Sequence, residues 1–415
     1  MARPHAEQVP EPAPRRAPDL VPTPASTGPE PTPVLPDYAG GCIANLAPAL
    51  LAASGRARDA GPAPAWLPAG VGGARQIVLL VLDGLGWCQL TEWADRAPTL
   101  SSAEGIDRPI TSVAPSTTAT ALTSIGTGSP PNRHGILGYR MATPDDEVLN
   151  VLRWQLGSCA ARDARRELPA AAFQSQATFP GFGGPVPVVT RDGFAQTGFT
   201  IAQIGRSRVH GYKVTSSIVP LTTEILATGA PLVYVYYDGI DKVAHERGLG
   251  TWYGEELEEV DRLVSRLAAA LPGDAVLVVT ADHGQVEVGT DVILPPAGVL
   301  RHTRLLTGEG RFRWFHARAD AAGDLLHAAR DAFGEVAWVR SRTEVVEAGW
   351  FGGRLAPELA GRLGDVAVVP HEPVAVLDPA DTGETRLACR HGSLTADEML
   401  VPLVVVGAGS GGGNI

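Results

Sequence analysis

The sequence predicts an α/β protein in which a doubly wound, mostly parallel β-sheet is sandwiched by helices, and three observations support this fold. Residues 76–82, 232–237 and 275–280 are continuous apolar runs, which are typical of parallel strands covered on both faces. Residues 253–271 place leucine and valine at three- and four-residue spacing, which predicts a helix between the second and third runs. Polar residues follow each run. A strand, helix, strand order makes the strands parallel, and such sheets bind substrates at their carboxyl ends.

The other elements of the core are predicted from shorter patterns. Residues 43–53 have helical periodicity, and residues 119–125 can continue as a helix after a turn. Residues 199–204 are a weaker strand candidate. Residues 401–406 form a last apolar run that closes the series of strands.

Residues from about 291 to 375 have a different pattern. Residues 311–315 and 336–339 are predicted as short strands, and residues 320–333 as a helix with its apolar side chains on one face. Because the sheet pattern resumes afterwards, we expect a small α/β insertion in the catalytic domain.

Residues 1–36 contain eleven prolines and almost no aromatic or β-branched residues. Such a segment cannot bury enough apolar surface to offset its ordering entropy, so we expect a disordered Pro-rich tail. We interpret it as dispensable, with docking of a partner as the alternative. The catalytic domain is then expected to span residues 37–415.

Composition argues against several classes of protein. The formal net charge of −11 argues against a protein that binds nucleic acid polymers. Phosphate-bearing substrates stay open, because bound metal cations reverse the local charge. The four cysteines form no C-x-x-C pair, and no secretory signal or long apolar stretch occurs. We therefore expect a cytoplasmic protein without disulfides and without a membrane span.

Two of the apolar runs end at possible metal ligands. Asp83 follows the first run, where a carboxylate can bind a metal or cap the next helix. Asp282 and His283 follow the third run side by side, and the glycine after them allows a sharp turn. Two adjacent ligand types at a strand end favour a metal site.

A second set of possible ligands follows the second run and precedes the last one. Asp241 and His245 are four residues apart, so both lie on one face of a predicted helix. A surface Asp–His pair is the alternative. Asp238 is a competing ligand with less favourable spacing, and we interpret it as a support residue. His391 repeats the His-Gly pattern before the last run.

A Thr-rich turn at residues 115–118 precedes the predicted helix at 119–125. A hydroxyl at a helix start meets free backbone N–H groups and the positive end of the helix dipole, which together favour phosphate. The alternative is that Ser116 or Thr117 caps the helix, and local sequence favours this alternative.

Together these motifs resemble the alkaline phosphatase superfamily, and within it the type I phosphodiesterase/nucleotide pyrophosphatase family. The resemblance runs from about residue 76 to residue 407 and is weakest in the insertion. The matching motifs are Val81-Leu82-Asp83-Gly84, Pro115-Ser116-Thr117-Thr118, Thr127-Gly128 with His134-Gly135, Asp241-x3-His245, Asp282-His283-Gly284 and His391-Gly392.

The resemblance implies an alkaline-phosphatase-like hydrolase of phosphate esters that uses two zinc ions. Manganese or another divalent ion would fit the same donors. The substrate would be a small-molecule phosphate ester, and the family branch favours a phosphodiester or a nucleotide pyrophosphate. The implied ligand sets are Asp241, His245 and His391 for one ion, and Asp83, Asp282 and His283, with Thr118 as a fourth ligand, for the other.

The resemblance also implies that Thr118 is the nucleophile, because its spacing to His134-Gly135 matches the family pattern. A phosphothreonyl intermediate would form and water would hydrolyse it. The family carries an asparagine after the His-Gly turn that contacts a phosphate oxygen. This chain has none there, so Tyr139 or Arg140 would have to substitute.

Other functions stay open at this stage. A phosphomonoesterase or a phosphonoacetate-type C–P hydrolase would need an additional cation at the phosphoryl site, for which Arg133, Arg140 and Arg390 are candidates. A non-catalytic protein that keeps the fold as a scaffold is a further alternative, and the intact ligand set argues against it.

Overall fold

The computed structural model describes residues 30–56, 62–157, 161–205, 207–381 and 386–407. Residues 1–29 of the predicted tail lie outside this part of the chain. A compact unit begins at Thr32. In it the backbone N–H of Val34 donates to the carbonyl of Leu394 at 2.9 Å, and Val34 packs against the core. The last residues of the predicted tail therefore belong to the compact unit.

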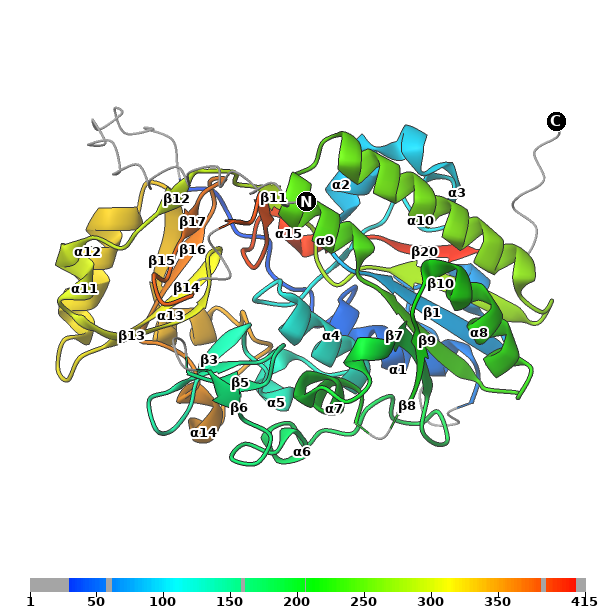
Figure 1. Ribbon diagram of the computed structural model, residues 1–415, viewed down its shortest axis with the longest axis horizontal. Coiled ribbons are helices and arrows are strands. Elements are labelled where there is room, and N and C mark those ends of the chain that lie inside the picture. The colour runs from blue at the N-terminus through cyan, green and yellow to red at the C-terminus, as the bar shows by residue number, and fades with distance from the viewer. Residues whose placement is uncertain (1–29, 57–61, 158–160, 206, 382–385, 408–415) are drawn as a thin grey trace, which may run out of the picture. The chain divides into compact units, whose positions relative to one another are not determined.

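The central sheet of the fold has six strands and lies in the right half of Figure 1. Its strands are β1 (Gln76–Leu82), β7 (Pro187–Arg191), β8 (Arg208–Tyr212), β9 (Leu232–Tyr237), β10 (Ala275–Thr280) and β20 (Leu403–Val406). Their order is β20-β10-β1-β9-β7-β8, and all are parallel except β20, which pairs antiparallel with β10. The three apolar runs are β1, β9 and β10, so the predicted parallel sheet is confirmed.

The last apolar run divides into two strands. Pro402, which has no backbone N–H, separates β19 (Leu400–Val401) from β20. β19 pairs with β2 (Ile110–Thr111), outside the central sheet.

Helices cover both faces of the central sheet. They are η1 (Ile43–Asn45) with α1 (Leu46–Ala53), α4 (Thr118–Thr127), α7 (Gly198–Ile204), α8 (Ile218–Leu226), α9 (Gly239–Arg247) and α10 (Thr251–Ala270). Figure 1 shows α10 on one side of the sheet and α1 and α4 on the other. The helices predicted at residues 43–53, 119–125 and 253–271 are confirmed.

The prediction of a strand at residues 199–204 is wrong, because this segment is α7. The Thr197 side chain accepts a hydrogen bond from the backbone N–H of Thr200 and caps the helix. Most of α7 is buried, so its apolar run lacks the polar face that would have indicated a helix.

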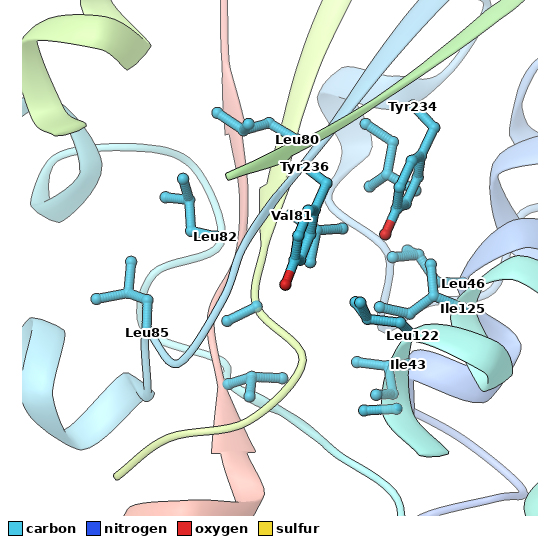
Figure 2. Close-up of a cluster of buried hydrophobic side chains, with 14 of the residues drawn as sticks. Ile43, Leu46, Leu80, Val81, Leu82, Leu85, Leu122, Ile125, Tyr234 and Tyr236 are labelled. Atoms are coloured by element: carbon cyan, nitrogen blue, oxygen red, sulfur yellow. The ribbon is translucent and has the colours of Figure 1, made fainter. Parts of the chain in front are cut away.

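The side chains of β1 alternate between the two faces of the sheet. Figure 2 shows Val81 on the same side as Tyr234 and Tyr236 of β9, facing Leu122 of α4. Leu80 and Leu82 point to the other side, and all these side chains are buried. A strand buried on both faces explains why β1 reads as a continuous apolar run.

The segment predicted as an insertion contains its own antiparallel sheet, in the order β13-β14-β16-β15. α12 packs on this sheet around a separate core that includes Phe315 and Phe333. The predicted strands and helix of this segment are confirmed to within two residues. The elements are β13 (Thr303–Glu309), β14 (Phe312–Ala317), α12 (Ala322–Phe333), β15 (Ala337–Ser341), α13 (Arg342–Glu347), α14 (Pro357–Ala360) and β16 (Val366–Pro370).

Shorter elements complete the described chain. A small antiparallel sheet of β3 (Arg140–Ala142), β4 (Val148–Asn150), β5 (Gln155–Leu156) and β6 (Arg162–Asp163) follows α4 in the chain. Among the described residues, no helix is both long and apolar enough to cross a membrane. The remaining short α-helices and strands are α2 (Trp87–Glu92), α3 (Pro98–Ser101), α5 (Pro131–His134), α6 (Ala170–Phe173), β11 (Val286–Glu287), β12 (Val292–Ile293), α11 (Ala297–Leu300), β17 (Ala375–Val376), β18 (Cys389–Arg390) and α15 (Ala396–Met399).

Candidate metal centre and active site

The carboxyl ends of three neighbouring strands position most of the predicted ligands. β10, β1 and β9 are adjacent and parallel, so their carboxyl ends meet at one edge of the sheet. Asp83 follows β1, Asp282 follows β10, and α9 after β9 carries Asp241. The turn after Asp83 requires glycine, because Gly84 has a φ of 74° and a Cβ there would lie 3.0 Å from Cβ of Asp241.

Asp83, Asp282 and His283 form a first group of possible ligands, with one donor atom from each within 4.8 Å of the others. Nε2 of His283 lies 3.4 Å from Oδ1 of Asp83 and 3.5 Å from Oδ2 of Asp282. The hydroxyl oxygen of Thr118 lies 3.1 Å from the same nitrogen. All four side chains are buried. The structure therefore gathers four polar side chains around one point inside the protein.

Among the described residues, each carboxylate of this first group uses one oxygen in hydrogen bonds and leaves the other oxygen without one. The Tyr236 hydroxyl donates to Oδ2 of Asp83, and the backbone N–H groups of Gly84 and His283 donate to Oδ1 of Asp282. Asp83 Oδ1 and Asp282 Oδ2 are buried and accept no hydrogen bond within the described part of the chain. Buried anionic oxygens without partners are costly. A divalent cation fits here, because it would satisfy both oxygens together with the histidine nitrogen.

Electrostatics at the first group also fit a cation. Burial, followed by the charge of Asp282, raises the pKa of Asp83 well above its ordinary value. Burial likewise raises the pKa of Asp282. A bound cation would reverse this effect and hold both carboxylates in their ionised form.

Asp241, His245 and His391 form a second group, whose donor atoms also lie within 4.8 Å of one another. Oδ1 of Asp241 lies 3.2 Å from Nε2 of His245 and 3.8 Å from Nε2 of His391. The two groups are neighbours, because the rings of His283 and His391 stack with centroids 3.6 Å apart. The members of each group are those that the sequence resemblance implies.

All three histidines of the two groups are oriented by backbone carbonyl groups. A hydrogen bond at Nδ1 places the proton there and leaves the lone pair of Nε2 facing the possible metal. Burial, followed by the nearby His283, also lowers the pKa of His391, which keeps that ring neutral. The bonds are His245 Nδ1 to Cys389 O at 2.7 Å, His283 Nδ1 to Gly284 O at 3.0 Å, and His391 Nδ1 to Ser116 O at 3.0 Å.

Thr118 is the first residue of α4, and Thr117 is the N-cap residue. Thr117 makes no side-chain capping bond; its hydroxyl donates to Oε2 of Glu309 at 2.9 Å. The Ser116 hydroxyl donates to the carbonyl of Ser393 at 2.6 Å. The alternative that one of these two hydroxyls caps the helix is therefore wrong. The first N–H groups of α4 receive no side-chain cap and lie beside Thr118.

Two residues that hold ligands in place were missed by the sequence analysis. Tyr236, which bonds Asp83, lies on the neighbouring strand β9 and has no local signal. Nε2 of Gln285 donates to Oδ1 of Asp241 at 2.6 Å. Its position directly after Asp282-His283-Gly284 was a signal that could have identified it.

Asp238 lies outside both groups. It is the N-cap residue of α9, it is buried, and its carboxylate pairs with Arg191 and Lys242. Its side chain makes no capping bond, and its ion pair with Lys242 is a contact within the segment that carries Asp241.

A cavity of about 510 Å³ opens beside Thr118 and Asp83. Most of its wall is apolar. Its charged lining consists of Arg153, Lys242 and the carboxylates of Asp83, Asp238 and Asp241. A small organic group therefore fits next to the Thr118 hydroxyl. The apolar lining includes Leu122, Val188, Phe194, Phe199, Tyr234 and Tyr236.

The two predicted substrate contacts, Tyr139 and Arg140, are not part of this lining. The Arg140 guanidinium is buried and lies 2.6 Å from Oδ2 of Asp378 and 3.4 Å from Oδ2 of Asp381. The Tyr139 hydroxyl accepts a hydrogen bond from Nδ2 of Asn150 at 2.7 Å. Arg140 is thus engaged in a buried ion pair, and we do not retain it as a substrate contact.

The family model for type I phosphodiesterase/nucleotide pyrophosphatase matches residues 77–394. The chain belongs to this family. The match spans most of the chain and includes every residue of both ligand groups and Thr118. The protein is therefore a hydrolase of phosphate esters in the alkaline phosphatase superfamily.

Solved structures show the same fold. Murine ectonucleotide pyrophosphatase/phosphodiesterase 5 is 17% identical, with a TM-score of 0.58 over 80% of this chain and 88% of that one. An inactive variant of that protein has been solved with AMP. Phosphonoacetate hydrolase from Sinorhizobium meliloti 1021, in complex with phosphonoformate, is 20% identical, with a TM-score of 0.58 over 82% of this chain and 92% of that one. A comparison with curated proteins gave no match.

Proposed function

We propose that the protein is a zinc-dependent phosphodiesterase or nucleotide pyrophosphatase that acts through Thr118. The observation that carries this proposal is the convergence at Thr118. Its hydroxyl lies 3.1 Å from Nε2 of His283, beside two carboxylate oxygens that accept no hydrogen bond within the described part of the chain.

Two metal ions fit the two ligand groups of the chain. Asp83, Asp282 and His283 would hold one ion together with Thr118, and Asp241 with its two histidines would hold the other. When bound, zinc lowers the pKa of a coordinated hydroxyl or water and neutralises charge on phosphoryl oxygens. Manganese satisfies the same donors and is the alternative ion.

The protein's own residues supply the nucleophile and its setting. Thr118 Oγ1 forms a bond to phosphorus while the O–P bond to the leaving group breaks, and the departing alcohol or phosphate takes up a proton to replace the one that the hydroxyl releases to solvent. This gives a phosphothreonyl intermediate, which water hydrolyses to regenerate the hydroxyl. The uncapped N–H groups at the start of α4 are suited to a negatively charged phosphoryl oxygen.

The cavity beside Thr118 favours a diester over a monoester. Its apolar wall can take an organic group attached to phosphorus, and a diester carries two such groups. A monoester brings an extra negative charge, for which Arg140 was a candidate partner. Asp378 and Asp381 already pair with Arg140, so the basic residues that line the cavity are Arg153 and Lys242, and Lys242 pairs with Asp238. The preference for a diester therefore rests on the apolar wall.

The test compares kcat/KM for three substrates after reconstitution with zinc. Bis-p-nitrophenyl phosphate and p-nitrophenyl phosphate share a leaving group and differ in ester number, and phosphonoacetate tests C–P cleavage. We expect the diester to be the best substrate by about tenfold or more, a difference in activation free energy of about 1.4 kcal/mol. Faster turnover of the monoester or of phosphonoacetate would replace the proposal by the corresponding alternative.

A further inference from the structure

The hairpin between β13 and β14 extends from the inserted segment to the loop that carries the nucleophile. Its tip consists of Glu309, Gly310 and Arg311. The Glu309 and Arg311 side chains are buried, with exposed fractions of 8% and 0%. Buried charged side chains at a hairpin tip indicate that the tip packs into the rest of the protein and does not lie over the site as a loose cover.

Arg311 fixes this tip through a buried ion pair. Its guanidinium lies 3.0 and 2.6 Å from the two carboxylate oxygens of Glu398. Its remaining nitrogen donates to the backbone carbonyls of Glu372 and Val374. Oε1 of Glu398 also accepts from the backbone N–H of Ser393 at 2.9 Å. The ion pair therefore links the hairpin tip to the loop at residues 391–393, which contains a predicted metal ligand.

Glu309 lies between that loop and the nucleophile turn. Oε2 accepts a hydrogen bond from the Thr117 hydroxyl at 2.9 Å. The Glu309 stem packs flat against Gly392, because a Cβ at Gly392 would lie 3.0 Å from both Cγ and Cδ of Glu309. Gly392 has a φ of 124°, so a side chain there would be strained as well as crowded.

The turn that precedes Thr118 also forms hydrogen bonds with the loop at residues 391–393. The backbone N–H of Ser116 donates to the carbonyl of Gly392 at 3.1 Å, and the Ser116 carbonyl accepts from Nδ1 of His391. Thr117 is the last residue before the nucleophile, and the Glu309 carboxylate receives its hydroxyl. A hydroxyl at an N-cap ordinarily bonds the first N–H groups of its own helix, and here it does not.

We propose that Glu309 is a positioning residue for the reaction. It draws the Thr117 hydroxyl away from the start of α4, which keeps the first N–H groups of that helix available to a phosphoryl oxygen. It also fixes the backbone immediately before Thr118. The inserted segment is then part of the catalytic apparatus. This inference rests on the proposed function, since it concerns how Thr118 is presented to phosphorus.

The experiment removes the hydroxyl and the carboxylate in turn, in zinc-loaded full-length protein. Thr117→Val keeps the side-chain shape but loses the donor, and we expect kcat on bis-p-nitrophenyl phosphate to fall about 10- to 100-fold. KM should stay within about threefold, because the bond orients the nucleophile and does not bind the organic group. Thr117→Ser restores the donor and should restore kcat. Glu309→Gln keeps an accepting oxygen and should retain most activity.

A double variant tests whether the two residues act together. Glu309→Ala should lower kcat at least as much as Thr117→Val does, because it also frees the Thr117 hydroxyl to cap α4, and the double variant should be no slower than Glu309→Ala alone. If Glu309→Ala does not fold, the kcat values of Thr117→Val and Thr117→Ser test the proposal by themselves. Thr123→Val is the matched control, because Thr123 is a buried residue of α4 whose hydroxyl donates to Ala119 within the helix. Its kcat should equal that of the wild type.

The outcomes separate this inference from the proposed function. Wild-type protein without diesterase activity would contradict the proposed function itself. Active wild type with an unchanged kcat in Thr117→Val would overturn the role of Glu309. A lower kcat in Thr117→Val that Thr117→Ser does not restore would also overturn it. So would a lower kcat in a Thr117→Val protein that has also lost bound zinc and has a lower Tm than the wild type.

Discussion

The hydroxyl oxygen of Thr118 lies 3.1 Å from Nε2 of His283, although 165 residues separate the two in the chain. α4 brings the threonine and the end of β10 brings the histidine. Their proximity places a weak nucleophile among donor atoms that suit a divalent cation. This relationship leads to the first prediction.

Thr118→Ala should abolish diester hydrolysis, with kcat reduced by about 10³-fold or more, because no other hydroxyl takes its place. The fold and most of the bound zinc should remain, since three protein ligands stay in each group. Steady-state kinetics and metal analysis measure the two effects. Hydrolysis by this variant at the wild-type rate would refute the nucleophile assignment.

Zinc should stabilise the protein as well as activate it. Asp83 Oδ1 and Asp282 Oδ2 are buried and accept no hydrogen bond within the described part of the chain, so a cation relieves a cost in the folded state. Zinc at 100 times its Kd adds about 2.7 kcal/mol to the free energy of unfolding. Thermal unfolding with zinc and with chelator should show the rise in Tm. In Asp282→Asn the rise should be smaller, and excess zinc should restore part of the activity.

Tyr236→Phe should weaken zinc binding without disturbing the core. The phenol donates to Oδ2 of Asp83, and loss of such an outer hydrogen bond lowers metal affinity by about 10- to 100-fold. Competition with a chromogenic chelator measures the affinity. Tyr234→Phe is the control, because Tyr234 lies on the same face of β9 and its hydroxyl accepts from Gln203. Equal affinities in the two variants would contradict the role of Tyr236.

His134 belongs to a family motif, yet its surroundings indicate a structural role. Nε2 lies 2.8 Å from the Ser124 hydroxyl, and Nδ1 accepts from the backbone N–H of Ile136. Burial lowers the pKa of His134 to about 3. The His134 imidazole therefore binds a proton below about pH 6.5 in the unfolded chain, but only below about pH 3 in the folded chain.

The contribution of His134 to stability is present above pH 6.5 and is lost as the pH falls towards 3. The loss should be about 1.4 kcal/mol of unfolding free energy per pH unit within that window. His134→Gln should remove this component, and urea unfolding at pH 7, 6 and 5 measures it. Parallel pH profiles for the two proteins would show that the imidazole does not titrate as predicted.

Filling the cavity should change substrate size preference. Leu122→Phe places a larger side chain in the wall near Thr118. We expect kcat/KM to fall about tenfold for a bis-aryl diester and less for a methyl aryl diester, because steric overlap grows with the organic group. Equal losses for both diesters would show that this cavity does not receive the ester group.

The sequence by itself determined the parallel sheet and the places of the possible ligands along the chain. Each of β1, β9 and β10 is buried on both faces, and that burial produces a continuous apolar run that can be read without a structure. Asp83, Asp241 and Asp282 come after these runs, and the carboxyl ends of adjacent parallel strands share one edge. α7 escaped prediction for the opposite reason, since a short buried helix has no polar face.

Tertiary structure alone decided how the site is held. Tyr236 reaches Asp83 across a strand pair, and Glu309 reaches Thr117 from a hairpin 192 residues away. It also paired Arg140 with Asp378, although the family resemblance had suggested Arg140 as a substrate contact. Hydrogen bonds and ion pairs between distant segments depend on side-chain directions and burial, which periodicity does not encode. The order of the motifs along the chain therefore pointed to the possible ligands, and packing determined their hydrogen-bond partners.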